Sequence, residues 1–145
     1  MADKSFAIRL VTPQGKLLDG QATYASVPAH DGLIGFEAGR APIVFKLGLG
    51  EMTVTFANDA KGVGGGSRNY LVEDGFAQMV GNKLTVLTTR AIPASDLVEA
   101  DASKELAEAE KKSSPNLAQM DRISRDRDRA RLKLRLARNA SGKGI

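Results

Sequence analysis

The sequence predicts an all-β N-terminal domain followed by a C-terminal helical hairpin. Two observations support this fold class. Residues 1–92 consist mainly of short runs in which apolar and polar side chains alternate, separated by Gly, Pro, Asn and Asp. Residues 93–145 lose this pattern and become rich in Ala, Glu, Leu, Lys and Arg, which favour helix. We therefore expect an antiparallel sandwich or barrel over 1–92 and an antiparallel two-helix hairpin over 93–145.

The strands of the first domain are expected where the alternation is clearest, at 6–11, 21–28, 51–58, 69–73, 76–80 and 83–89. Asp74-Gly75 and Gly81-Asn82 separate the last three stretches, and both dipeptides are hairpin signals because Asn, Asp and Gly tolerate positive φ. The glycine-rich stretch 61–67 is interpreted as a hairpin tip rather than a phosphate loop, because no Gly-Lys-Ser/Thr follows it.

The two helices are expected at 94–112 and at about 117–138. Ser95 is the expected N-cap of the first helix, and Ser114 with Pro115 is expected to begin the second. The expected facing residues are Val98, Ala102, Leu106 and Ala109 on the first helix and Ile123, Ala130, Leu134 and Ala137 on the second. Such small side chains bury little apolar area, so the hairpin is expected to be weakly held and able to open.

Charge is divided unevenly between the two helices. Residues 93–112 carry three basic and six acidic side chains, whereas residues 113–145 carry nine basic and three acidic ones. The interleaved Asp121, Asp126 and Asp128 would repel a phosphate backbone and suit ion pairs along the helix. From the residues alone, this basic surface is a solvated face, the contact for an acidic protein, or a site for nucleic acid or membrane. A nucleic-acid-binding module that uses the basic helix is the alternative function.

Several classes of chemistry are excluded by composition. The chain has no Cys, which excludes thiolate catalysis, disulfides and Cys-based metal sites. Its single His, His30, excludes a His-cluster metal site and is expected in a turn with Asp31-Gly32 at its tip. No apolar run reaches the length of a signal peptide or a membrane span. We expect a soluble protein with no catalytic residues, no metal and no cofactor.

Four motifs occur in an order that resembles one family. They are Val11-Thr12-Pro13, Val27-Pro28 through Gly32 and Gly35, Gly39-Arg40-Ala41-Pro42, and Asp74-Gly75-Phe76-Ala77. Together they resemble the ε subunit of rotary F-type ATP synthases, the equivalent of mitochondrial δ, and the resemblance covers essentially the whole chain. It implies a sandwich of about ten short antiparallel strands in a non-catalytic subunit of the central stalk. Such a subunit couples proton translocation through the membrane ring to ATP synthesis through the γ shaft.

The resemblance also implies partners and contact residues. The γ subunit is expected at Gly39, Arg40, Ala41 and Pro42, and the membrane ring of c subunits at Ala29, His30, Asp31, Gly32 and Leu33. Arg40 replaces the usual His of its motif, and Leu33 stands where a bacterial relative has an acidic residue. The implied location is peripheral, on the cytoplasmic face of a bacterial inner membrane or an equivalent organelle membrane. Neither nucleic-acid binding nor direct insertion into the membrane is implied.

In some relatives the hairpin opens and blocks ATP hydrolysis by meeting an acidic stretch of the catalytic α/β head. The residues of this chain that correspond are Arg122, Arg125, Arg127, Arg129 and Arg131. Other relatives bind ATP on the hairpin through an Ile/Leu-Asp-x-x-Arg-Ala motif, which here has Val98 in place of Asp and Asp101 in place of Arg. Because a carboxylate repels phosphate, we expect this chain not to bind ATP by that route.

Overall fold

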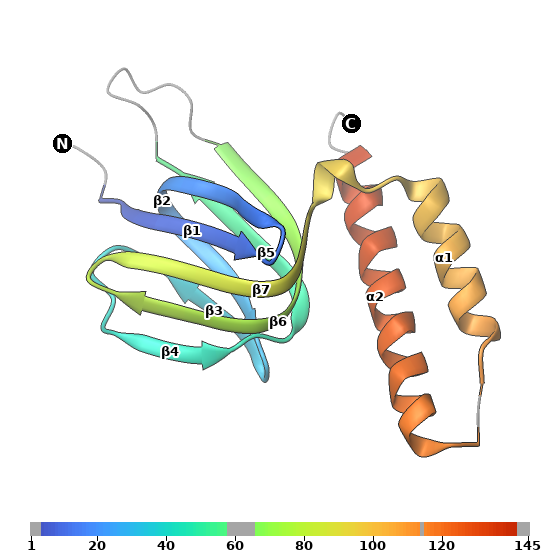
Figure 1. Ribbon diagram of the computed structural model, residues 1–145. Coiled ribbons are helices and arrows are strands. Elements are labelled where there is room, and N and C mark those ends of the chain that lie inside the picture. The colour runs from blue at the N-terminus through green and yellow to red at the C-terminus, as the bar shows by residue number, and fades with distance from the viewer. Residues whose placement is uncertain (1–3, 58–65, 114, 142–145) are drawn as a thin grey trace. The chain divides into compact units, whose positions relative to one another are not determined.

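The computed structural model describes residues 4–57, 66–113 and 115–141. It divides into two compact units, Met1–Ala91 and Ile92–Ile145. Strands form the first unit and helices form the second, as Figure 1 shows. The expected hairpin tip at 61–67 falls largely, and Ser114 falls entirely, outside the described residues.

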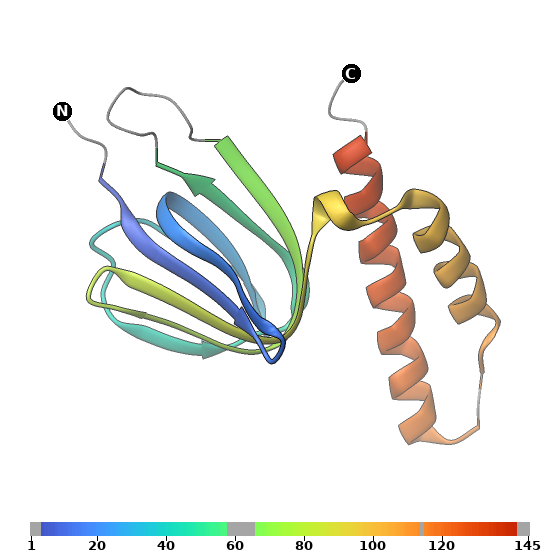
Figure 2. The same cartoon turned by 45° about the horizontal axis from the view of Figure 1, so that its top comes forward.

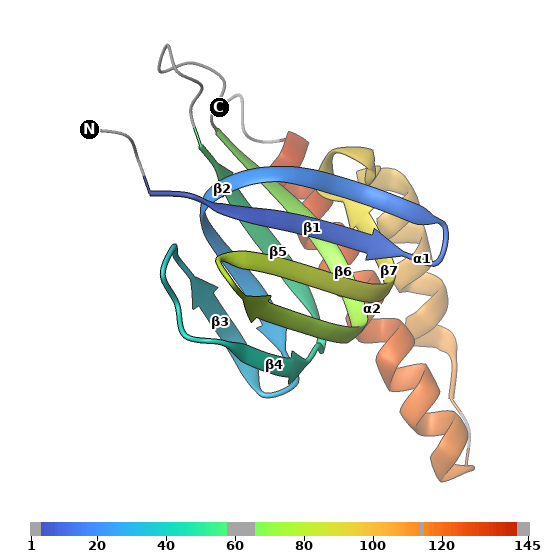
Figure 3. The same cartoon turned by 60° about the vertical axis from the view of Figure 1, so that its left-hand side comes forward.

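The first unit is a seven-stranded sheet folded into a sandwich. Its strands are β1 Phe6–Thr12, β2 Gly15–Ala29, β3 Gly32–Phe36, β4 Ile43–Lys46, β5 Leu49–Phe56, β6 Gly66–Val80 and β7 Lys83–Pro93. The strand order is β1-β7-β6-β5-β2-β3, with β4 paired to β6 and β1 also paired to β2. The pairings of β1, β7, β6, β5 and β2 therefore close a ring, and β3 and β4 remain as edge strands (Figure 3).

The fold class is confirmed, and its details differ from expectation in four respects. β3 and β4 lie outside the expected strand ranges. Seven strands are described instead of about ten, because β2 and β6 each continue for 15 residues. The pairing of β1 with β7 is parallel. Asp74-Gly75 is not a hairpin but lies within β6, where φ values of 59° and 120° accompany the change of partner from β5 to β4. The hairpin at Gly81-Asn82 is confirmed, with φ values of 58° and 61°.

The core of the sandwich follows the period-two pattern of the sequence. Phe6, Ile8 and Leu10 of β1 and Met52 and Val54 of β5 are fully buried. Thr88 of β7 is a buried polar exception. Its hydroxyl lies 2.9 Å from the carbonyl oxygen of Glu73 and 2.8 Å from that of Asp74. This hydroxyl therefore joins β7 to the bend in β6.

The second unit consists of a short 3-10 helix, η1 Ala94–Asp96, and the helices α1 Glu99–Lys111 and α2 Leu117–Ser141, which run antiparallel (Figure 2). The expected N-cap Ser95 lies in η1, and α1 begins after Val98 without a side-chain cap. Pro115 precedes the cap of α2 rather than forming its first residue. The cap is Asn116, whose Oδ1 accepts from the backbone N–H of Ala118 at 2.9 Å.

The helix faces are partly as expected. Ala102 and Ala109 of α1 are buried, as are Ala130 and Ala137 of α2. Val98 was expected to face α2 but is 55% exposed. Leu132 and Leu136 are buried although they lie outside the expected apolar stripe. None of the described helices is long and apolar enough to cross a membrane.

Candidate interaction surfaces

The segment Gly39–Pro42 connects the two edge strands, and Arg40 lies on the edge of the core there. The Arg40 guanidinium is 5.0 Å from the centroid of the Phe36 ring. Phe36 is itself fully buried and stacks on Phe45, with ring centroids 5.7 Å apart. The stacked rings join β3 to β4, which do not pair with each other, so a cation covers an aromatic contact between the two edge strands.

Hydrogen bonds fix this segment on both sides. Arg40 Nη1 donates to the carbonyl oxygen of Gly35 at 3.1 Å, on the edge strand β3. The backbone N–H of Gly39 donates to Asn82 Oδ1 at 2.9 Å, and Asn82 Nδ2 donates to the carbonyl oxygen of Ser5 at 2.8 Å. Asn82 is one of the two residues of the β6–β7 hairpin, so the segment is tied to a rigid turn as well as to its own strand.

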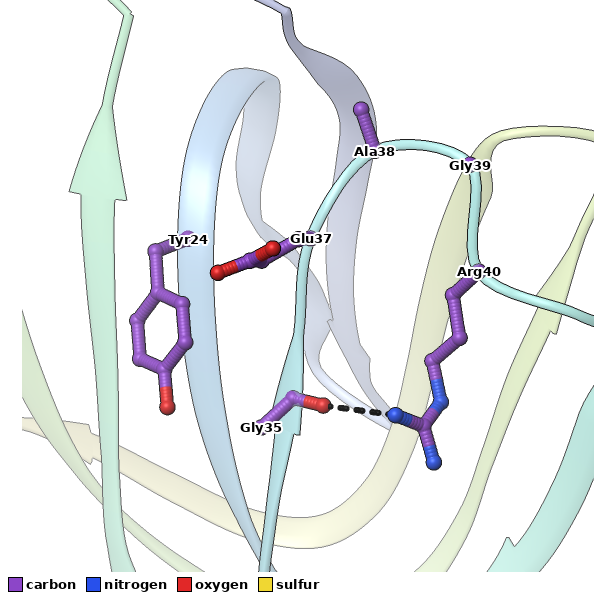
Figure 4. A pocket seen from close by; sticks show the side chains of 6 residues that line it. All are labelled: Tyr24, Gly35, Glu37, Ala38, Gly39 and Arg40. Atoms are coloured by element: carbon purple, nitrogen blue, oxygen red, sulfur yellow. Dashed lines mark hydrogen bonds between the residues drawn. The ribbon is translucent and has the colours of Figure 1, made fainter.

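A pocket of about 430 Å³ opens beside Arg40, lined by Tyr24, Gly35, Glu37, Ala38, Gly39 and Arg40. Figure 4 shows Tyr24 and Arg40 on opposite sides of Gly35, with the Glu37 carboxylate pointing toward the Tyr24 side. A Cβ on Gly35 would lie 2.5 Å from the Tyr24 hydroxyl, so only glycine leaves this space open. The pocket thus offers a guanidinium, a carboxylate and a hydroxyl, which suits recognition of polar side chains.

The expected ring-facing residues form the turn between β2 and β3. Ala29 pairs with Gly32, so His30 and Asp31 are the two central turn residues. The turn is confirmed, although its tip is one residue earlier than expected. The backbone N–H of His30 donates to the carbonyl oxygen of Lys46 at 2.9 Å, which holds the turn against β4. Leu33 is 69% exposed beside it, so the turn presents an apolar side chain to solvent.

A second surface was missed from the sequence. Val44, Phe76, Val80 and Leu87 are exposed apolar residues on the outer side of β4, β6 and β7; we call them the apolar patch. In β6 the buried Ala77 and Met79 alternate with the exposed Phe76 and Val80. The signal was available, because β6 carries apolar residues on both faces where a strand with one solvated face has polar ones. Gln78, which pairs with Val44, is exposed between Phe76 and Val80, so the apolar patch is a mixed surface rather than a continuous apolar one. Exposed apolar residues gathered on one face of a sheet are typical of interaction sites.

The five arginines expected to inhibit hydrolysis lie along α2 in different environments. Arg122 and Arg131 are exposed, and Arg131 lies 3.8 Å from Asp128. Arg125 and Arg129 are half-buried, and Arg129 Nη1 donates to Asp126 Oδ1 at 2.9 Å. Arg127 crosses to α1, where its Nη2 donates to the carbonyl oxygen of Lys112 at 2.8 Å.

Two basic side chains of α2 form ion pairs with acidic side chains of α1. Lys133 Nζ lies 3.1 Å from both carboxylate oxygens of Glu105, and Arg138 Nε lies 3.1 Å from Glu99 Oε1. The Arg138–Glu99 pair is more than half exposed on the arginine side, and exposed pairs contribute little stability. The surface of α2 therefore carries both basic and acidic side chains. Its Arg138–Glu99 contact with α1 is exposed and can be exchanged for another partner, whereas the Lys133 side chain is only 17% exposed in its contact with Glu105.

Comparison with known proteins gives one consistent result. Residues 5–94 match the family described as ATP synthase, Delta/Epsilon chain, beta-sandwich domain. An ATP synthase epsilon chain of Rhodopirellula baltica is 38% identical over 100 residues, covering 69% of this chain and 73% of that one. The ATP synthase epsilon chain of Rhodobacter capsulatus is 33% identical over 111 residues, covering 77% of this chain and 78% of that one.

Two solved structures share the fold at low identity. A chain of the Euglena gracilis mitochondrial ATP synthase (OSCP/F1/c-ring, rotational state 1) is 19% identical and superposes with a TM-score of 0.68, covering all of this chain and 84% of that one. A chain of the Tetrahymena thermophila mitochondrial ATP synthase central stalk and c-ring is 13% identical, with a TM-score of 0.65 over 94% and 99% of the two chains.

Proposed function

The chain belongs to the ATP synthase delta/epsilon chain family, and on that premise we propose that it is a non-catalytic subunit of the enzyme's central stalk. The match of residues 5–94 to the β-sandwich of this family is the observation that carries the proposal. The subunit couples proton translocation through the ring of c subunits to ATP synthesis by joining the ring to the γ shaft.

Coupling requires two contact surfaces held at a fixed distance, and we assign both to the sandwich. The β2–β3 turn, Ala29–Leu33, meets the ring, and the Gly39–Pro42 segment meets γ. These segments lie at opposite ends of β3, and both are hydrogen-bonded to the sheet, the first to Lys46 and the second to Asn82. The apolar patch extends the γ surface along β4, the strand that follows Pro42. The rigidity of the sheet supports transmission of torque between them.

The helical hairpin restrains ATP hydrolysis in this proposal. The basic side chains of α2 leave their partners in the closed hairpin for an acidic stretch on the catalytic head. Those partners are acidic side chains of α1 and of α2 itself and carbonyl oxygens at the end of α1. The exposed Arg138–Glu99 pair between the helices supports this role, as does the exposed Arg131–Asp128 pair along α2, because exposed pairs are readily exchanged. The basic charge orients the helix and speeds its encounter with the head more than it raises affinity. The subunit then works at the membrane surface, on the cytoplasmic face of a bacterial inner membrane or its organelle equivalent, through its contact with the ring.

Binding to γ tests the central claim. The tagged full chain should retain purified γ subunit from the same organism on an affinity resin and should co-elute with it as a complex in size exclusion. A chain that is folded by circular dichroism and still does not retain γ would remove the proposed function.

A further inference from the structure

Arg40 is held in one orientation by the residues around it. The Phe36 ring supports the guanidinium plane at 5.0 Å, and the carbonyl oxygen of Gly35 accepts one N–H at 3.1 Å. Although Arg40 is exposed, no described carboxylate forms an ion pair with it, and that includes Glu37 in the same pocket. A guanidinium has five N–H donors, so four remain for a ligand. We propose that Arg40 binds a carboxylate side chain of the γ subunit and determines the specificity of this contact.

Preorganisation favours this use of Arg40. A free arginine side chain loses rotamer entropy when it binds, whereas one that already lies on a buried ring loses less. The backbone of the segment is also fixed, through Gly39 and Asn82. The remaining donors are therefore presented in a set geometry, which matches the planar, two-oxygen shape of a carboxylate.

The pocket sets the orientation of the bound partner. The Arg40 guanidinium and the Glu37 carboxylate occupy different sides of it (Figure 4). An acidic side chain entering the pocket is attracted at the Arg40 side and repelled at the Glu37 side, so the two charges admit one orientation. A volume of about 430 Å³ is large enough for one or two side chains.

The inference rests on the proposed function, since γ is the partner, and it adds the chemistry of the contact. The family motif that this segment resembles has His at the position of Arg40. Arginine is charged at every physiological pH and is bidentate, whereas histidine is neutral for much of that range. The γ subunit that matches this chain should therefore present Asp or Glu to the pocket.

The test compares the affinity of purified γ for the wild-type chain and for Arg40→Gln, Arg40→Glu and Arg40→Lys at low and high salt. Arg40→Gln should weaken binding about tenfold, because a hydrogen bond to a charged group is lost. Arg40→Glu should weaken binding further. The affinity of Arg40→Lys for γ should lie between that of the wild-type chain and that of Arg40→Gln. The salt dependence of γ binding should be shallower for Arg40→Gln than for wild type.

Arg68→Gln is the matched control. Arg68 is also an exposed arginine over an aromatic ring, 5.3 Å from the centroid of Phe56, but it lies on β6 outside the pocket. The Arg68→Gln chain should bind γ with the same affinity as the wild-type chain. If Arg40→Gln instead binds γ with unchanged affinity and salt dependence, Arg40 only covers the edge of β3 and the inference is wrong, while the proposed function stands. If the folded wild-type chain fails to bind γ, the proposed function is lost as well.

Discussion

Arg127 of α2 closes the helical hairpin by donating from Nη2 to the carbonyl oxygen of Lys112, 2.8 Å away, just past the end of α1. Its Nε lies 3.4 Å from the carbonyl oxygen of Ala109. The last carbonyls of a helix have no partner within the helix and carry partial negative charge. The guanidinium therefore serves as the C-terminal cap of a different helix, and it joins α1 and α2 at their connected ends.

Replacing this cap should destabilise the hairpin. We expect Arg127→Ala to lower the free energy of unfolding of the helical unit by about 1–2 kcal/mol, because charge-assisted hydrogen bonds to helix carbonyls are lost. Faster hydrogen exchange at the backbone amides of α1 would measure this loss of stability. The control is Arg122→Ala, an exposed arginine on the same helix with no partner among the described residues. Equal exchange rates in the two variants would contradict the capping role.

Removing the hairpin should release its restraint on hydrolysis. A chain that ends at Ile92 keeps β1 to β6 and nearly all of β7, so the rotor contacts proposed for the sandwich remain. We expect membranes reconstituted with this chain to hydrolyse ATP faster than membranes with the full chain, at equal amounts of bound subunit. Unchanged hydrolysis would mean that α2 does not act as a brake, and would leave the stalk role in place.

The bend in β6 should tolerate no side chain at Gly75. A Cβ there would overlap the carbonyl oxygen of Leu87, at a φ of 120°. We expect Gly75→Ala to destabilise the sandwich by about 3 kcal/mol or more, because both backbone strain and steric overlap oppose it. Gly81→Ala is the control, since Gly81 has a φ of 58° but no atom within 4 Å of the added Cβ, and it should cost about 1 kcal/mol. Similar midpoints in chemical denaturation would contradict the steric argument.

The bend at Asp74-Gly75 could not be distinguished from a hairpin by the local sequence. Asp74-Gly75 and Gly81-Asn82 give the same signal, positive φ between apolar runs, yet one is a bend within a strand and the other a hairpin. The difference depends on the pairing of β6 with β5 and then β4, which local sequence does not specify. Alternation did predict the core, and Asn116 could have been recognised as a cap. The contact of Arg40 with Phe36 could not, because it depends on how the loop folds back on β3.

The apolar patch should contribute to γ binding without supporting the fold. Phe76 is 58% exposed on the outer side of β6, so Phe76→Ser removes little buried area from the core. We expect about a tenfold loss of γ affinity, the size of an aromatic contact in an interface, with an unchanged thermal midpoint. Leu17→Ser changes an exposed apolar residue on β2 outside the patch and should leave γ binding unchanged. Equal affinities for the two variants would show that the patch lies outside the interface.

The start of α1 combines a stability prediction with a ligand prediction. Val98 occupies the N-cap, is 55% exposed and offers no side-chain acceptor to the first helical N–H groups. Val98→Asp should supply that acceptor and place a negative charge at the positive end of the helix dipole. Together the two effects should raise the free energy of unfolding of the helical unit by about 1 kcal/mol. Val98→Thr is a control that caps without charge, and a Val98→Asp variant no more stable than wild type would contradict the capping argument.

The family resemblance implies an ATP-binding motif that would have Asp at position 98 and Arg at position 101. Asp101 lies exposed in the first turn of α1, where its carboxylate repels a triphosphate. Calorimetry of the wild-type chain with ATP should therefore show no binding at micromolar concentrations. Asp101→Arg alone reverses that charge, and with Val98→Asp it restores both motif residues. If ATP binds the wild-type chain and the double variant equally well, the charge at position 101 does not control binding.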